Sequence, residues 1–203
     1  MELIKNISVR DLTHLKECMH SCEQTKGLTV LEHGEQVSDY FLDLYEHVIS
    51  GKSLKHEWRL PKWVFDSALW SRLMPLDIIT EYHWFHDCGK PFCRVTDAEG
   101  KVHFPDHAAV SADIWLRLGL NEKVAKLMRH DMDIHLLKAN GLDDFVSMPE
   151  AATLLLTGLS EIHANASMFG GTESVSFKMK YKQIERRGKA IVSLLNKGDC
   201  HEQ

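Results

Sequence analysis

The 203 residues of the chain include 29 acidic and 24 basic side chains, which gives a net charge of −5 at neutral pH. This length allows one domain with a sizeable core, and the negative charge argues against broad non-specific binding to nucleic acid. No segment has the ~18 consecutive apolar residues of a membrane span, and no apolar signal-peptide region follows Met1, so we expect a cytoplasmic protein.

Thirteen histidines and five cysteines stand out in the composition. An odd number of cysteines without framework spacing indicates reduced thiols. A first helix is expected over about residues 9–22, where His14, Cys18 and Cys22 repeat at intervals of four. Such a spacing can bind zinc, but no second ligand pair follows at the spacing of a zinc finger. We therefore favour a partly buried helix with free thiols.

The next segment, from Thr29 to about Ile49, has the pattern of a strongly amphipathic helix. His33 lies on its apolar face, where a single histidine is more often a hydrogen-bonded core residue than a ligand. After a polar loop over 51–61, we expect another helix over 63–73, ended by Pro75. The apolar stripe of the amphipathic helix consists of Val37, Phe41, Leu44 and Val48.

His86 and Asp87 stand at the end of an apolar helix expected over residues 77–87. An imidazole nitrogen and a carboxylate oxygen from adjacent residues can hold a cation together. Gly89 is expected to let the chain turn, and Pro91 is expected to prevent a helix from continuing. An adjacent His-Asp pair is weak evidence alone, so its meaning depends on further ligands elsewhere in the chain.

Two stretches of alternating residues, 92–96 and 101–104, flank a turn that contains Asp and Gly, and they predict a small β-hairpin. Asp106 is the expected N-cap of the following helix, which carries His107 on its inner face. Gly119 is expected to end this helix.

Asn121 is the expected N-cap of the next helix, on which Leu127, His130 and Ile134 share one face. Glu161 lies on the apolar stripe of a later helix. The remaining segments are a loop over 141–149, a helix over 150–168, a turn at 170–172 and a last helix over 178–196. The expected fold class is therefore all-α, with one short hairpin.

Five polar side chains each lie on the apolar face of a different predicted helix. Burying all of them without partners costs several kcal/mol. They can be satisfied by separate hydrogen bonds to core backbone groups or together by a metal centre, and we favour the metal centre. These side chains are His33, His86, His107, His130 and Glu161.

The order of these residues resembles the HD-domain superfamily of metal-dependent phosphohydrolases, and the closest local similarity is to the HD domain of bacterial tRNA nucleotidyltransferases. The similar sequence motifs run from His86 to Pro91, from Asp106 to Ala112 and from His130 to His135. The resemblance covers about residues 29–168 of a single expected domain, 1–203, with helical extensions at both ends. It implies an HD-domain helical bundle around one or two divalent metal ions.

By this resemblance, Asp87 bridges two metals, and the last ligand of the first metal is Glu161. Many members have Asp at that position, and Asp131 and Asp133 compete with Glu161 for the role. The identity of the metal stays open among Mn, Ni, Co, Fe, Zn and Mg. The full set of implied ligands is His33, His86, Asp87, His107, His130 and Glu161.

The implied reaction is hydrolysis of a phosphoester of a nucleotide or an RNA end, including a 2′,3′-cyclic phosphodiester. Asp87 would orient the attacking hydroxide, and Lys90 would neutralise charge on the phosphate. His135 would bind the phosphate or protonate the leaving oxygen. The plainer interpretations are a solvated lysine and a surface histidine. Two other functions stay open, a di-iron oxygenase of the HD type and a non-catalytic nucleotide-binding module. The oligomeric state stays open too, and a homo-oligomer is one possibility.

The segment 178–189 is locally basic, with six Lys and Arg residues and the single acid Glu185. It would steer a nucleotide or RNA phosphate by its charge, or it is the solvated face of a terminal helix. The sequence alone slightly favours the solvated face.

Overall fold

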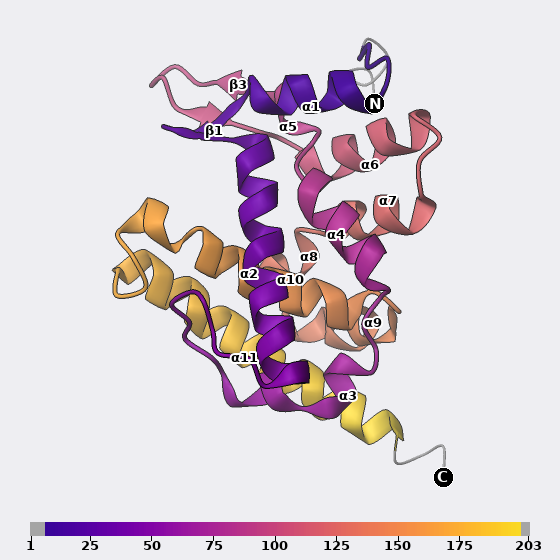
Figure 1. Ribbon diagram of the computed structural model, residues 1–203, viewed down its shortest axis with the longest axis vertical. Coiled ribbons are helices and arrows are strands. Elements are labelled where there is room, and N and C mark those ends of the chain that lie inside the picture. Colours follow the sequence, from indigo (N-terminus) through magenta and orange to yellow (C-terminus); the bar gives the residue numbers. More distant parts are fainter. Residues whose placement is uncertain (1–6, 200–203) are drawn as a thin grey trace. The chain divides into compact units, whose positions relative to one another are not determined.

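The computed structural model describes residues 7–199, and Figure 1 shows the course of the chain. Helices dominate, and the described strands pair into two small antiparallel sheets, so the all-α class is confirmed. None of the described helices combines the length and the apolar character of a membrane span. Residues 1–6, on which part of the signal-peptide argument depends, and residues 200–203 lie outside the described part.

The described residues form two compact units, each built from two separate stretches of the chain. The first unit contains the described residues up to Gln36 together with Asp77–Asp131, and the second contains Val37–Leu76 together with the described residues from Met132 onward. The long helix α2 (Val30–Ser50) contributes its first turns to the first unit and the remainder to the second.

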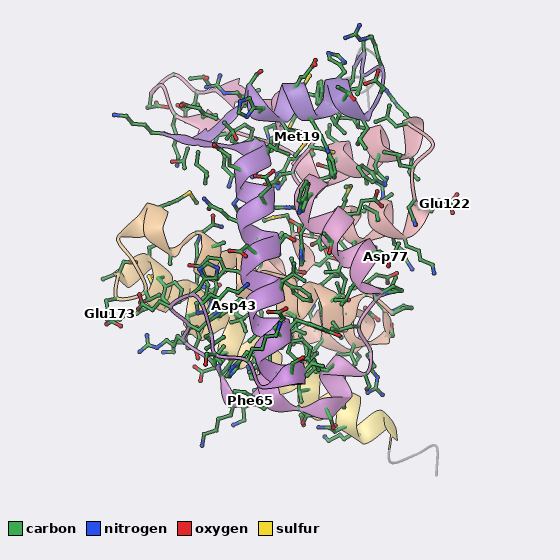
Figure 2. The ribbon with its side chains drawn as sticks, viewed as in Figure 1. Met19, Asp43, Phe65, Asp77, Glu122 and Glu173 are labelled. Atoms are coloured by element: carbon green, nitrogen blue, oxygen red, sulfur yellow. The ribbon has the colours of Figure 1, made fainter. Side chains whose placement is uncertain are left out.

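The first unit is a set of short helices with two hairpins. Met19 (Figure 2) and Leu15 are fully buried on α1, and α1 packs against α5. The elements after α1 (Leu12–His20) are β1 (Glu23–Thr25), β2 (Leu28–Thr29), α4 (Leu76–Phe85), α5 (Lys90–Cys93), β3 (Val95–Thr96), β4 (Val102–His103), α6 (His107–Arg117) and α7 (Glu122–Arg129).

Helices α6 and α7 form a hairpin within this unit, as Figure 1 shows. Gly119 ends α6 as predicted, because its φ of +70° is readily adopted only by glycine. Asn121 caps α7 as predicted, since its side chain accepts a hydrogen bond from the Lys123 N–H. Asp106 occupies the N-cap position of α6, but it has a φ of +53° and its side chain makes no capping hydrogen bond.

The second unit is built around α10 and the long C-terminal α11, which pack against each other (Figure 1). Asp43 (Figure 2), on α2, accepts hydrogen bonds from the backbone N–H groups of Lys55 and His56 and from the indole of Trp58. These bonds hold the loop that follows α2 in place. The unit's other elements are η2 (Lys62–Phe65), α3 (Ser67–Trp70), α8 (Asp133–Leu136), η3 (Ala139–Gly141), α9 (Leu142–Ser147), α10 (Ala151–Ala164), η4 (Ala166–Phe169) and α11 (Val175–Asp199).

Several predicted segments are wrong in detail. The expected helix over 63–73 is two short pieces, and the expected loop over 141–149 contains α9. The helix expected to carry His130 and Ile134 together is interrupted, because α7 ends at Arg129 and α8 begins at Asp133.

The regions of the two hairpins differ from the prediction as well. A second hairpin, β1–β2, was not expected from the sequence. Phe92 and Cys93, predicted as strand, belong to α5, which has Pro91 in its first turn. Pro91 therefore helps to begin a helix, where it was expected only to stop one.

Candidate metal centre

Three buried side chains of the first unit meet at metal-ligand spacing. His33 comes from the first turn of α2, and His86 and Asp87 come from the turn that follows α4. One ligand atom from each lies within 4.8 Å of the others, and none of the three residues is more than 2% exposed. Within residues 7–199, no other group of at least three His, Cys, Asp or Glu side chains has this spacing. His14, Cys18 and Cys22, considered above for zinc, are not brought together at this spacing.

The Asp87 carboxylate lies at the centre of the group. Its Oδ2 is 3.2 Å from His86 Nε2 and 3.7 Å from His33 Nε2. Its Oδ1 is 3.5 Å from His107 Nε2, at the start of α6. Of the six predicted ligands, His33, His86 and His107 thus lie around Asp87, although His107 lies outside the closest group.

Backbone carbonyl groups fix the orientation of two of the imidazoles. His86 Nδ1 lies 2.8 Å from the His83 carbonyl oxygen, and His107 Nδ1 lies 2.9 Å from the Phe104 carbonyl oxygen. Because a carbonyl oxygen only accepts, each Nδ1 is the donor and each Nε2 is directed at Asp87. A neutral Nε2 lone pair facing a carboxylate is repulsive unless a proton or a metal ion lies between them. Metal-binding histidines commonly donate their other ring N–H to a backbone carbonyl oxygen, as these two do.

Lys90 contributes positive charge at the same Asp87 oxygen, Oδ2, that His86 and His33 face. Its Nζ lies 2.5 Å from Asp87 Oδ2 and 2.7 Å from Gln24 Oε1, and it is 5.5 Å from the centre of the Phe104 ring. Burial would raise the pKa of Asp87, but the Lys90 ammonium, followed by His86, holds that pKa well below its usual value. Asp87 is therefore an ionised carboxylate at neutral pH, which is the form that binds metal.

Two glycines set the backbone distances around the group. A Cβ at Gly34 would lie 2.5 Å from the Trp84 carbonyl oxygen, so α2 and α4 approach more closely than any other residue allows. A Cβ at Gly89 would lie 2.6 Å from Ser111 N and 2.7 Å from the His107 carbonyl oxygen. Gly89 lies in the turn over 86–89, as expected, but its φ of −78° is open to any residue, so its special need is for space against α6.

The surrounding side chains are buried and hydrogen-bonded. The Tyr82 hydroxyl donates to Asp131 Oδ1, and the Tyr82 ring lies 6.1 Å from the His86 ring. Asp131, considered above as a competing ligand, is therefore engaged by a phenol. Burial raises the pKa of the Cys88 thiol to about 12, so this thiol beside Asp87 stays protonated at neutral pH.

Three further predicted site residues lie outside the closest group. His130 belongs to the first unit, where its N–H donates to the Lys126 and Leu127 carbonyl oxygens at the end of α7. His135 and Glu161 belong to the second unit, where His135 Nε2 lies 2.8 Å from Glu161 Oε2. Their roles as metal ligands or substrate contacts stay predictions.

Sequence reasoning missed the residues that hold the ligands. Gln24 lies in the unpredicted β1–β2 hairpin and reaches Lys90 across 66 positions of sequence. Ser111 accepts from the Gly89 N–H through its Oγ at 2.8 Å, and although it lies in the similar stretch from Asp106 to Ala112, the sequence prediction gave it no role. The carbonyl partners of His86 and His107 each lie three residues earlier, a spacing that a helical turn permits but does not require.

No protein-family model matches the chain, and no curated protein matches it. Two imidazoles and one ionised carboxylate, all buried, suit a divalent transition metal or iron, and the His33–His86–Asp87 group fits such an ion.

Proposed function

We propose that this chain is a metal-dependent phosphohydrolase that cleaves a phosphoester of a nucleotide or an RNA end. The observation that carries the proposal is the convergence of imidazole Nε2 atoms on the ionised carboxylate of Asp87. The order of ligands along the chain, which resembles the HD domains, supports the same class of reaction.

His33, His86 and Asp87 would hold the metal, and His107 would help to hold a second ion. A divalent ion at such a site polarises a phosphoryl oxygen and lowers the pKa of a water molecule. Asp87, being ionised and central, would orient the attacking water through its carboxylate.

Lys90 would meet the phosphate. Its side chain is 12% exposed, and Gln24 and Phe104 restrict its position, so its charge is fixed before substrate arrives. A fixed cation stabilises the charge that builds on phosphoryl oxygens more than a mobile one does. The side chain of His107 is 18% exposed, whereas those of His33 and Asp87 are at most 2% exposed. Substrate would therefore arrive on the side of Lys90 and His107.

By the resemblance, Glu161 completes the ligands of the first metal and His130 those of the second. His135 would bind the phosphate or protonate the leaving oxygen. In this proposal, the 2.8 Å contact between His135 and Glu161 orients the imidazole by the carboxylate.

The test combines metal analysis with a panel of phosphoesters. Wild-type protein purified without an affinity tag is expected to contain transition metal and to hydrolyse at least one nucleotide, 2′,3′-cyclic nucleotide or RNA-end phosphate when loaded with Mn, Ni or Co. His86→Ala is expected to lose both metal and activity. His20→Ala, which changes an exposed histidine on α1, is the matched control. Metal-loaded wild-type protein that cleaves nothing would overturn the proposal.

A further inference from the structure

Helix α11 concentrates positive charge in an acidic chain. Its segment 178–189 contains six basic residues and one acidic residue, a net charge of +5, whereas the whole chain carries −5. The other residues together therefore carry −10. Such a separation of charge favours an anionic partner on this helix.

Three of these cations share one exposed face. Lys182, Arg186 and Lys189 line a shallow groove on α11, and none of them forms an ion pair with a residue in the described part of the chain. Glu185 lies in the same groove and leaves the face with a net charge of +2. Arg187 differs, because its Nε donates to the Leu137 carbonyl oxygen.

The opposite face of α11 is already buried. Phe177, Ile184 and Ile191 are at most 1% exposed. A helix that binds a membrane surface needs a free apolar face to insert, and α11 has none to offer along this segment. A stable interface with an acidic protein would need aromatic or aliphatic side chains that become buried in the contact. The only apolar side chain that lines the groove is the exposed Met179.

The spacing of the cations suits a nucleic-acid strand. At 1.5 Å per residue, Lys182, Arg186 and Lys189 span about 10 Å along the helix axis. One strand of stacked nucleic acid carries a phosphate about every 3.4 Å, so this span faces about three phosphates. We propose that the groove lined by Lys182, Arg186 and Lys189 binds the phosphate backbone of a nucleic-acid strand. The metal group lies in the other unit, so this inference does not depend on the proposed hydrolysis.

The salt dependence of RNA binding tests the proposal. Affinity of the full chain for labelled single-stranded oligo(U) of about 20 nucleotides is measured by fluorescence anisotropy in EDTA, which prevents turnover. Three phosphate contacts predict a slope of log affinity against log salt of about −2, or about a sixteenfold loss between ~50 and ~200 mM salt. The triple variant Lys182→Gln, Arg186→Gln, Lys189→Gln is expected to weaken binding at least about tenfold at low salt and to flatten the slope.

Two control variants separate this face from net charge and from damage to the fold. Lys182→Arg, Arg186→Lys, Lys189→Arg keeps the charges and is expected to keep the slope. Lys26→Gln, Lys101→Gln, Lys123→Gln lowers the net charge equally at exposed positions of the first unit and is also expected to keep the slope.

Each of four results would overturn the proposal. The first is that the wild-type chain does not bind RNA, and the second is that the first-unit control variant loses as much affinity as the triple variant. The third is that a poly-Glu peptide competes as well as RNA does. The fourth is that the three cations are needed for binding to phosphatidylserine vesicles but not for binding to RNA. The peptide result would assign the face to an acidic protein, and the vesicle result would assign it to a membrane surface.

Discussion

Replacing Gly89 with alanine tests the view that α6 is held against the Asp87 turn by backbone contact. The new Cβ would lie 2.6 Å from Ser111 N, about 0.8 Å inside the 3.4 Å at which ordinary contact begins. The two closest atoms belong to the backbone of α6, so no side-chain rotation relieves the overlap. The helix must move, and it carries His107 with it.

The expected cost follows from three contributions. Overpacking costs about 1–3 kcal/mol, and loss of the hydrogen bond from the Gly89 N–H to Ser111 Oγ costs about 0.5–1.5 kcal/mol. The lower backbone entropy of alanine in the unfolded chain offsets about 0.4–1 kcal/mol. The net loss in the free energy of unfolding is about 2 kcal/mol, equivalent to about 4–8 °C in Tm for a chain of this length.

Urea denaturation followed by circular dichroism measures this loss, and titration calorimetry measures the affinity for Mn, which should fall in the same variant. Gly141→Ala is the matched control, because its Cβ would meet only Leu137 Cδ1 at 3.7 Å, and a change within about 0.5 kcal/mol is expected. Adding Ser111→Ala to Gly89→Ala should not restore stability, since the backbone overlap remains. A Gly89→Ala protein as stable as wild type, with unchanged affinity for Mn, would refute the reasoning.

Three other predictions concern the metal group, Gly188 and His163. Chelation by EDTA should lower the Tm of metal-loaded wild type by about 5–10 °C, because a metal at ~100 times its Kd stabilises the folded state by about 2.7 kcal/mol. The Tm of His86→Ala should not change on chelation. Equal shifts in the two proteins, measured by calorimetry, would argue against the site. Gly188→Ala should lower the free energy of unfolding, measured by urea denaturation, by about 1–2 kcal/mol. The reason is that its Cβ would lie 2.7 Å from Trp63 Nε1 and closer to two ring carbons. Unchanged stability and tryptophan fluorescence would contradict that packing. Burial lowers the pKa of His163 from 6.5 to about 4, so the unfolded state binds more protons between these values. Its contribution, at most about 3 kcal/mol, is fully present above about pH 6.5 and is lost as pH falls towards about 4. The free energy of unfolding of His163→Gln should therefore fall less steeply over this range, and an identical pH dependence in the two proteins would count against a buried neutral imidazole.

The long amphipathic helices were predictable because their apolar residues repeat over several turns. Of the predicted stripe, Val37, Phe41 and Leu44 are fully buried and Val48 is only partly buried, and His33 on the same face is buried as well. Periodicity also predicted that His86 is buried, although α4 ends at Phe85 and His86 lies in the turn that follows.

The remaining features have weak local signals. No glycine or proline marks the break between α7 and α8, where the His130 N–H is shared between the Lys126 and Leu127 carbonyl oxygens. The β1–β2 hairpin is too short and too polar to show an alternating pattern. Contacts that depend on tertiary packing, such as Gln24 with Lys90, have no signature in sequence spacing.

The close approaches at Gly34 and Gly89 have a consequence for how this protein tolerates substitution. In both places one stretch of backbone rests directly on another, so these two distances near Asp87 are set by backbone contact and not by the size of a side chain. Leu, Ile, Val and Met can exchange in the core with little effect on these two distances. The histidines and the two glycines are therefore expected to be far less replaceable than the larger side chains around them.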